Sequence, residues 1–419
     1  MPDAVKLKPN AVFLGSGPLF FIQWMAAAAW TVPLSLVLKA HGLGQIIPYA
    51  FATSALASFV SPLIFGAMAD RHFAPVRVLR WLALASMTAV ILTSTAIQYR
   101  CNPCLVLALI QLYALCTAPT TSISTAIVMS TMNDPRSQFG PVRAMGTLGW
   151  MAGGWLISLL SADASPLAGL TCAATWLGLA AFTLTLPHVE PPENSQHLSW
   201  HERLGLDALT LLRQRDHRVV FLVTTLISIP MQAFYQFTPI ALRDAGFTRV
   251  SAWTTLGQTT ELVAMFSLGA LFLRWRVKWI LALGLFFAVL RFAFCAVNGK
   301  LWLLGGVMVH GVNYALVFAT AAIYVNERVD PAWRARAQAL LSLLNGGVGN
   351  LIGALGTGWW FAACTTHAGS EKSLGTTNWP VFWGGLSAAS AAVLIYFLVA
   401  YRGRAAESNP LPVPDRAAP

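Results

Sequence analysis

The sequence has few charged residues, and this shortage excludes an ordinary soluble globular protein. Only 10% of its 419 residues are charged and 16 are acidic, whereas 56% are hydrophobic. The mean hydropathy is +0.62. A soluble domain of this length needs a far more polar surface. The composition therefore indicates an all-α membrane protein that crosses the bilayer many times.

Other absences narrow the function. No Gly-rich phosphate loop ending in Lys is present, which argues against ATP-driven pumping. The expected membrane spans hold one carboxylate and no His/Cys/Asp constellation, so we expect neither an enzyme nor a metal or cofactor site. The longest polar stretch is too short for a separate sensor domain. The cysteines are scattered, and whether Cys101 and Cys104 form a disulfide stays open.

Apolar segments of about 20 residues, the length that crosses a bilayer, recur about twelve times. They predict two pseudo-symmetric bundles of about six transmembrane helices each, over residues 1–186 and 218–401. Residues 187–217 form the linker, in which 199–213 has the apolar spacing of an amphipathic helix. Residues 402–419 are expected to be a disordered cytoplasmic tail.

The basic residues report the orientation of the chain. The net charge is +11, but Lys and Arg fall mostly in alternate short loops rather than in one patch. Such loops face the cytoplasm in membrane proteins, which places both termini there. The charge therefore does not indicate a nucleic-acid partner.

Glu261 is the one carboxylate inside an expected span, residues 250–273. An ionisable group at the bilayer centre costs at least ~2.5–3.5 kcal/mol, so it marks a functional site by default. Thr254, Gln258 and Glu261 are spaced i, i+4 and i+7, which places them on one face of a helix. A structural alternative is that Glu261 neutralises Arg291, the other deeply placed charge.

Polar faces recur on several other spans. Arg143, Thr147 and Trp150 are also spaced i, i+4 and i+7, and they offer a guanidinium, a hydroxyl and an aromatic plane. A lone polar residue in a membrane helix is usually a helix–helix hydrogen bond, but recurring polar faces predict a hydrated central cavity. The further polar residues of these faces are Gln232, Tyr235, His310 and Tyr314.

A short motif repeats between the two halves. Gly66, Asp70 and Arg71 follow the second span, and the same Gly-to-Arg spacing returns at Gly269 and Arg274. Repeated halves are typical of secondary transporters. The first copy resembles the loop motif of the major facilitator superfamily, which implies that Asp70 braces the cytoplasmic gate.

The order of the motifs resembles the nucleoside:proton symporter family of that superfamily. The resemblance implies a bacterial inner-membrane protein and nucleoside contacts from Arg143, Thr147, Trp150, Gln232, Gln258 and Glu261. The motifs that carry it are Gln23-Trp24, Arg143-x-x-Gly146-Thr147-x-Gly149, Leu204-Gly-Leu-Asp-Ala208, Gln258-x-x-Glu261, Leu290-Arg291-Phe292 and His310-Gly311-x-x-Tyr314.

Two departures from the family pattern concern the cavity. Ala315 follows Tyr314 where the family often has Asp, and Tyr235 stands where it often has Asn. A second membrane carboxylate is therefore missing. Glu261 becomes the expected proton carrier, and His310 is either a second carrier or a hydrogen-bonded packing residue.

The sequence as a whole predicts a monomeric secondary transporter that imports nucleosides or nucleoside-like solutes with protons, by alternating access. A nucleobase needs an aromatic plane, which Trp150 or Tyr314 offers, and its polar groups need amide and carboxylate partners. One alternative is a major facilitator transporter of a sugar or another polar metabolite. A second is a membrane enzyme or sensor that transports nothing.

Overall fold

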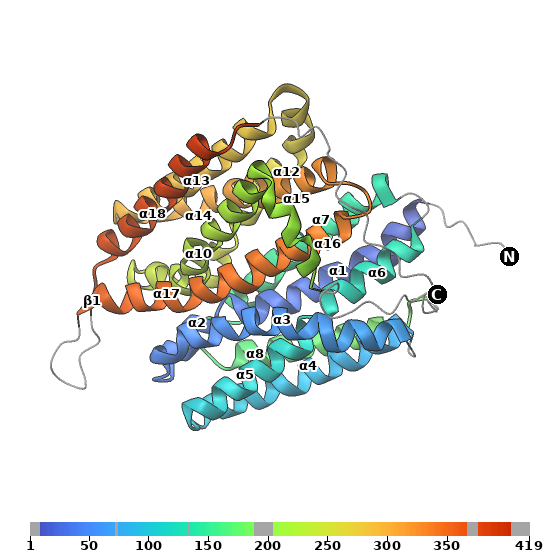
Figure 1. Cartoon of the computed structure of the whole chain (residues 1–419). Coiled ribbons are helices and arrows are strands. Elements are labelled where there is room, and N and C mark those ends of the chain that lie inside the picture. The colour runs from blue at the N-terminus through green and yellow to red at the C-terminus, as the bar shows by residue number, and fades with distance from the viewer. Residues whose placement is uncertain (1–8, 72–73, 133–134, 188–203, 367–375, 404–419) are drawn as a thin grey trace.

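The fold is almost entirely helical (Figure 1). The structure is a computed structural model, and it describes residues 9–71, 74–132, 135–187, 204–366 and 376–403. The first half contains α1 (Pro9–Thr31), α2 (Leu34–Ala40), the 3-10 turn η1 (Gly44–Ile46), α3 (Ile47–Arg71), α4 (Pro75–Gln98), α5 (Pro103–Thr117), α6 (Thr120–Thr131), α7 (Pro135–Leu159) and α8 (Leu167–Phe182).

The second half follows the linker and contains two π-helical segments, η3 and η4. Its elements are the 3-10 helix η2 (Leu206–Arg213), α10 (Arg215–Asp244), α11 (Val250–Thr254), α12 (Gly257–Arg274), α13 (Val277–Ala296), α14 (Lys300–Tyr314), η3 (Ala315–Ala319), α15 (Thr320–Arg328), α16 (Arg334–Ser342), η4 (Leu343–Gly349), α17 (Asn350–Ala363), the antiparallel strands β1 (Thr365–Thr366) and β2 (Thr376–Thr377), and α18 (Trp379–Ala400).

The membrane character of the fold is confirmed by the lengths of its helices. Among the described residues, 9 helical stretches are long and apolar enough to cross a bilayer, and Gly44–Val60 and Leu167–Phe182 are shorter apolar helices. This agrees with the predicted all-helical, multi-pass membrane protein. The finer count of about twelve spans stays a prediction.

Each half packs mainly on itself, and the two halves meet along a few helices. In the first half α1 packs on α7 and α8, and in the second α13 packs on α14 and α18. Contacts between the halves are made by α3 with α17 and by α7 with α11. In Figure 1 the blue helix α3 lies beside the orange α17, which belongs to the far end of the sequence.

Glycines let α1 and α7 approach closely. A Cβ at Gly149 would overlap the backbone carbonyl of Phe21, and one at Gly153 would lie 2.5 Å from the carbonyl oxygen of Met25. Small residues at such crossings allow two membrane helices to pack backbone against backbone. This packing fixes the face of α7 that carries Arg143, Thr147 and Trp150.

The linker differs from the predicted amphipathic helix over 199–213. Residues 188–203 lie outside the described residues, and the part that is described forms the 3-10 helix η2. Its Ala208 and Leu211 are buried, and Asp207 forms a 3.7 Å ion pair with Arg336 of α16. The described part of the linker therefore docks on the second half.

Two other predicted features fall at the edge of what the structure describes. Gly66, Asp70 and Arg71 lie at the end of α3, but their side chains are outside the described part of the chain. Residues 404–419 of the predicted disordered tail are also outside it. The proposed gate role of Asp70 therefore stays a prediction.

We predict that Gly149→Ala destabilises the protein, because the added methyl group overlaps the backbone of Phe21. Overpacking of this kind typically costs about 1–3 kcal/mol. Thermal unfolding of the purified protein in detergent measures the change. Gly178→Ala on α8 is the matched control, since nothing lies within 4 Å of its added Cβ. Equal unfolding temperatures for the two variants would contradict the proposed close packing.

Candidate functional site

A central cavity of about 100 Å³ lies where the two halves meet. Helices α1 and α7 of the first half form one side, and α10, α12 and α14 of the second half form the other. Sites at such an interface are typical of transporters built from repeated halves. The lining residues are Trp24, Arg143, Gly146, Thr147, Trp150, Tyr235, Gln258, Glu261 and Tyr314.

The first-half wall is aromatic and cationic. The Arg143 guanidinium lies over the Trp24 ring, 4.7 Å from its centroid, and the Trp24 and Trp150 centroids are 6.0 Å apart. Gly146 makes this arrangement possible, because a Cβ there would lie 2.7 Å from Trp24 and 2.8 Å from Arg143. The Nε1 donor of Trp24 is buried and has no hydrogen-bond partner among the described residues. It is free to bind a solute.

The second-half wall is placed by a break in the eighth expected span. The predicted continuous helix is interrupted at Thr255 and Leu256, between α11 and α12. A Cβ at Gly257 would lie 2.6 Å from the Val307 carbonyl, and one at Gly311 would overlap the Gly257 carbonyl. The backbones of α12 and α14 therefore touch where α12 begins. Broken helices at a binding site are a feature of secondary transporters.

The break separates Thr254 from the two residues predicted to share its face. Gln258 and Glu261 line the cavity, whereas Thr254 is not among the lining residues. Its hydroxyl instead donates to the Val250 carbonyl, 2.9 Å away. The Oε1 acceptor of Gln258 is buried and has no partner in the described part of the chain. A polar ligand in the cavity could therefore donate to this oxygen and accept from the Trp24 Nε1 donor.

Opposite charges from the two halves share the cavity. Arg143 comes from α7 and Glu261 from α12, and both line it. Each charge lowers the cost of placing the other inside the bilayer. The alternative that Glu261 neutralises Arg291 is not supported, since the described contacts of Arg291 go to other groups.

Arg291 lies fully buried inside the second half, with aromatic rings in place of a carboxylate. Its guanidinium carbon is 4.1 Å from the centroid of Phe292 and 5.2 Å from that of Phe234. Its Nη1 donates to Nδ1 of His310 at 2.6 Å and to the sulfur of Met231 at 3.2 Å. An aromatic face attracts a cation through its quadrupole, so these rings partly replace water around the charge.

This arrangement fixes the state of His310. Because Arg291 is always a donor, the Nδ1 atom of His310 must accept, and the proton of the neutral ring sits on Nε2. Nε2 lies 3.4 Å from the Tyr235 hydroxyl, and the imidazole stacks on Phe234 with 3.9 Å between centroids. The Tyr235 oxygen then accepts from His310, which leaves its own hydrogen for the cavity.

The structure brings together most of the predicted site. Two predicted residues do not line the cavity. Gln232 packs against α17, where a Cβ at Gly353 would lie 2.9 Å from its Cγ, and His310 lies behind Tyr235. Trp24 lines the cavity but was not predicted as a site residue, since only the resemblance marked it. The predicted residues that line the cavity are Arg143, Thr147, Trp150, Tyr235, Gln258, Glu261 and Tyr314.

Hydrogen bonds join the two halves at one end of the molecule, which we call the closed end. Asp163, which follows α7 and is 4% exposed, accepts from the backbone N–H of Ser251 at 2.6 Å. It also accepts from the Ser158 hydroxyl at 3.0 Å, and that hydroxyl accepts from the N–H of Ala252 at 2.9 Å. These side chains of the first half therefore cap the start of α11 in the second half.

Comparison with known proteins places the chain among nucleoside transporters. A family model described as nucleoside H+ symporter matches residues 17–406. YegT of Escherichia coli (strain K12), which carries a provisional name as a nucleoside transporter, is 30% identical over 95% of this chain and 96% of its own. Nucleoside permease NupG of the same organism is 22% identical over 92% of this chain and 94% of its own.

The solved structures confirm the fold. The crystal structure of a single-residue mutant of nucleoside transporter NupG superposes with a TM-score of 0.84, at 21% identity, over 93% of this chain and 100% of that one. The crystal structure of NupG without this mutation superposes with a TM-score of 0.80, also at 21% identity, over 93% of this chain and 99% of that one. At this identity the likeness establishes the fold alone.

We predict that His310→Ala destabilises the protein, because it removes the acceptor of the buried Arg291 N–H. Hydrogen bonds to charged groups contribute about 1.5–3 kcal/mol. The double change with Arg291→Met should cost less than the sum of the single changes, since the uncompensated charge is then removed as well. Reversible unfolding in mixed micelles measures both effects.

His41→Ala provides the control, since the His41 side chain bonds only to the Val37 carbonyl of its own turn among the residues that the structure describes. It should change stability by less than about 0.5 kcal/mol. Strictly additive effects of His310→Ala and Arg291→Met would show that the two groups do not interact.

Proposed function

From the membership of this chain in the nucleoside H+ symporter family, we propose that it imports nucleosides or nucleoside-like solutes with protons through the central cavity. It is a transporter and not an enzyme. The observation that supports this site best is its composition: aromatic planes, an unpartnered Trp24 donor, an unpartnered Gln258 acceptor and one carboxylate meet between the two halves.

The chemistry of a nucleoside fits these groups. The base stacks on Trp150 or Tyr314, which stand on opposite sides of the cavity. The ribose hydroxyls donate to Glu261 and to the free Oε1 of Gln258, and the edge of the base meets Arg143. The cavity of about 100 Å³ is smaller than the ~300–1,000 Å³ usual for ligand pockets, so it must widen during the cycle.

The cycle proposed here is alternating access between two bundles of about six helices each. The boundaries stay those predicted, residues 1–186 and 218–401, joined by the linker 187–217. In Figure 1 α1 begins and α18 ends toward the same side of the molecule, which suits an even number of crossings and two cytoplasmic termini. The end closed by Asp163 is then the outer side of the inner membrane, and the protein works as a monomer.

The proton is assigned to Glu261 alone. A protonated His310 would hold a second positive charge 2.6 Å from an Arg291 nitrogen, and no described carboxylate contacts either residue to balance them. His310 therefore does not carry the transported proton. Its role in this mechanism is to orient the Tyr235 hydroxyl. Glu261 can take a proton when the cavity faces outward and release it inward together with the solute.

We predict that uridine and adenosine exchange through the purified protein in proteoliposomes, whereas glucose does not. Trp150→Ala should raise the half-saturating concentration of uridine about 5- to 150-fold, since a base–aromatic contact contributes roughly 1–3 kcal/mol. Counterflow of labelled solutes measures both. Trp155→Ala on the same helix, at a side chain 49% exposed, should change nothing. Exchange of glucose as fast as uridine would favour the sugar-transporter alternative.

We predict that Glu261→Gln abolishes uphill uptake driven by a pH gradient and preserves part of the counterflow. The amide can still hydrogen-bond the solute, but it carries no proton. Glu327→Gln, at an exposed carboxylate on α15, is the control and should keep full gradient-driven uptake. If Glu261→Gln still accumulates uridine against its gradient, the proton passes through another group.

A further inference from the structure

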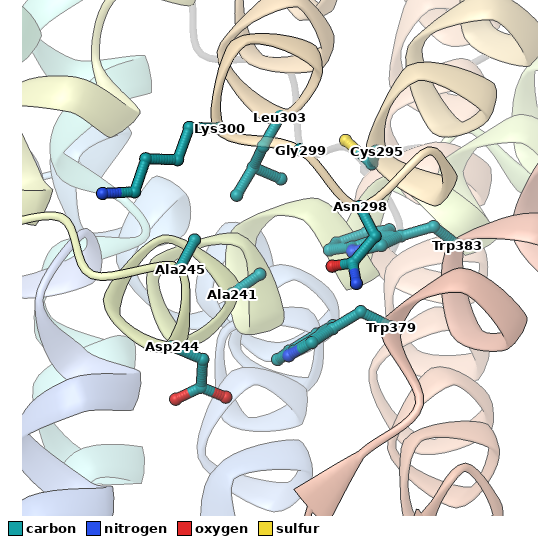
Figure 2. Close-up of a pocket in the computed structure, with 10 residues that line it drawn as sticks. All are labelled: Ala241, Asp244, Ala245, Cys295, Asn298, Gly299, Lys300, Leu303, Trp379 and Trp383. Carbon is teal, nitrogen blue, oxygen red and sulfur yellow. The ribbon is translucent and has the colours of Figure 1, made fainter.

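A second cavity, of about 330 Å³, lies at the closed end of the molecule and within the second half (Figure 2). It is formed by the end of α10, the turn between α13 and α14, and the start of α18. Its volume reaches the lower bound of ligand pockets, ~300 Å³, which the central cavity does not. The transport mechanism described above makes no use of it.

Aromatic rings and the exposed amide of Asn298 line this cavity. Trp379 and Trp383 are stacked, with 5.8 Å between centroids and 16° between planes. Trp383 is fully buried, and its Nε1 donor has no partner among the described residues. The Asn298 side chain points toward the two indoles in Figure 2. Its backbone has φ 60°, a conformation that Asn tolerates better than most residues.

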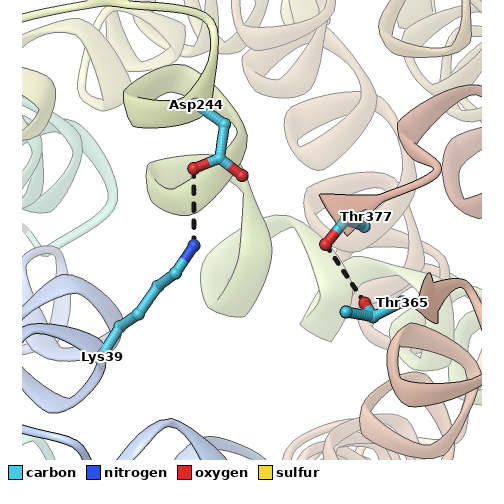
Figure 3. A network of polar contacts seen from close by, with 4 residues as sticks. All are labelled: Lys39, Asp244, Thr365 and Thr377. Atoms are coloured by element: carbon cyan, nitrogen blue, oxygen red, sulfur yellow. Dashed lines mark hydrogen bonds and ion pairs between the residues drawn. The ribbon is translucent and has the colours of Figure 1, made fainter. Parts of the chain in front are cut away.

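The hairpin before α18 fixes the position of these indoles. The Thr365 and Thr377 hydroxyls lie 3.1 Å apart across β1 and β2 (Figure 3), and the N–H of Asn378 donates to the Cys364 carbonyl at 2.8 Å. The Asn378 side chain then accepts from the N–H of Val381 and caps α18. Trp379, the first residue of α18, is therefore held at the mouth of the cavity.

Two charged residues complete the rim, and one of them bridges the halves. The Lys300 ammonium lies 5.7 Å from the centroid of Phe247. Asp244 forms a 3.4 Å ion pair with Lys39 of α2, which belongs to the first half (Figure 3). The same carboxylate thus belongs both to the cavity and to the contact that closes this end.

We propose that this cavity is a second nucleoside site, and that its occupant competes with Lys39 for Asp244. The inference rests on the proposed function, because it takes the same solute class. The base stacks on Trp379, its polar edge meets Asn298 and the free Nε1 of Trp383, and the ribose hydroxyls donate to Asp244. A solute bound here weakens the Lys39–Asp244 ion pair at the closed end before the central cavity opens.

Other ligand classes fit these walls less well. An anion would meet the Asp244 carboxylate, and a lipid chain would leave the buried Nε1 of Trp383 without a partner. A neutral, planar solute with hydroxyl groups satisfies the aromatic faces, the amide and the carboxylate together. The effect on closure is modest, since exposed ion pairs contribute little to stability.

Binding stoichiometry tests the proposal directly. Labelled adenosine is titrated into the purified full chain in lipid nanodiscs, by equilibrium dialysis. We expect two nucleosides per wild-type chain and one per chain after Gln258→Ala, which disables the central cavity. In the Gln258→Ala background, Trp379→Ala should weaken the remaining binding at least 5-fold, as loss of base stacking predicts. Asn298→Gly, which keeps the backbone conformation, should weaken it as well.

The control is Trp302→Ala, near the start of α14. The Trp302 side chain is 46% exposed and does not line the cavity. It should leave both sites unchanged. One nucleoside per wild-type chain, lost on Gln258→Ala, would overturn the second site and leave the proposed function standing. No nucleoside bound to the wild type would overturn both.

The competition for Asp244 predicts effects of opposite sign. Lys39→Gln frees the carboxylate and should tighten binding at the second site about two- to fivefold. Asp244→Asn removes the carboxylate and should weaken it by a similar factor. If the ion pair were merely structural, both changes would act in the same direction or not at all, and that result would refute the competition.

Discussion

The cost of placing charge in hydrocarbon is the constraint on which the structure depends. An isolated charge at the bilayer centre costs at least ~2.5–3.5 kcal/mol, so each one here has a device that lowers the cost. Arg143 and Glu261 face one cavity from opposite halves. Arg291 lies between aromatic faces and donates to a neutral His310. Arg143 and Glu261 line a cavity, whereas Arg291 and His310 are fully buried and reach only its Tyr235 side.

Irregular backbone brings these groups into reach of one another. The break before Gly257 and the contact of α12 with Gly311 place Gln258 and Glu261 beside Tyr314. The π-helical segment η3 begins directly after Tyr314, and η4 interrupts the Gly-rich span between α16 and α17. Such insertions occur often at functional sites, because they turn side chains without ending the helix.

Periodicity and composition were sufficient to predict the helical membrane fold. They also predicted that Arg143 and Trp150 share one face, because both residues lie on a single uninterrupted helix. Periodicity and composition did not predict the features that depend on contacts between residues far apart in the sequence. The interruption between α11 and α12 was not predicted, and Thr254, which lies before it, does not line the cavity. Trp24 joined the site through its contact with Arg143 across two helices. The sequence left His310 as a possible proton carrier, because its 2.6 Å contact with Arg291 appears only in the three-dimensional structure.

The central claim is that one positive charge crosses the membrane with each neutral nucleoside, carried by Glu261, the one carboxylate among the described residues that line the cavity. Each such charge gains ~2.3 kcal/mol per 100 mV of membrane potential. The charge moved per nucleoside can be measured by recording uridine-evoked currents from proteoliposomes on a solid-supported membrane, beside tracer uptake. The account predicts a sustained inward current of about one charge per uridine. Full uridine uptake without net charge movement would contradict it.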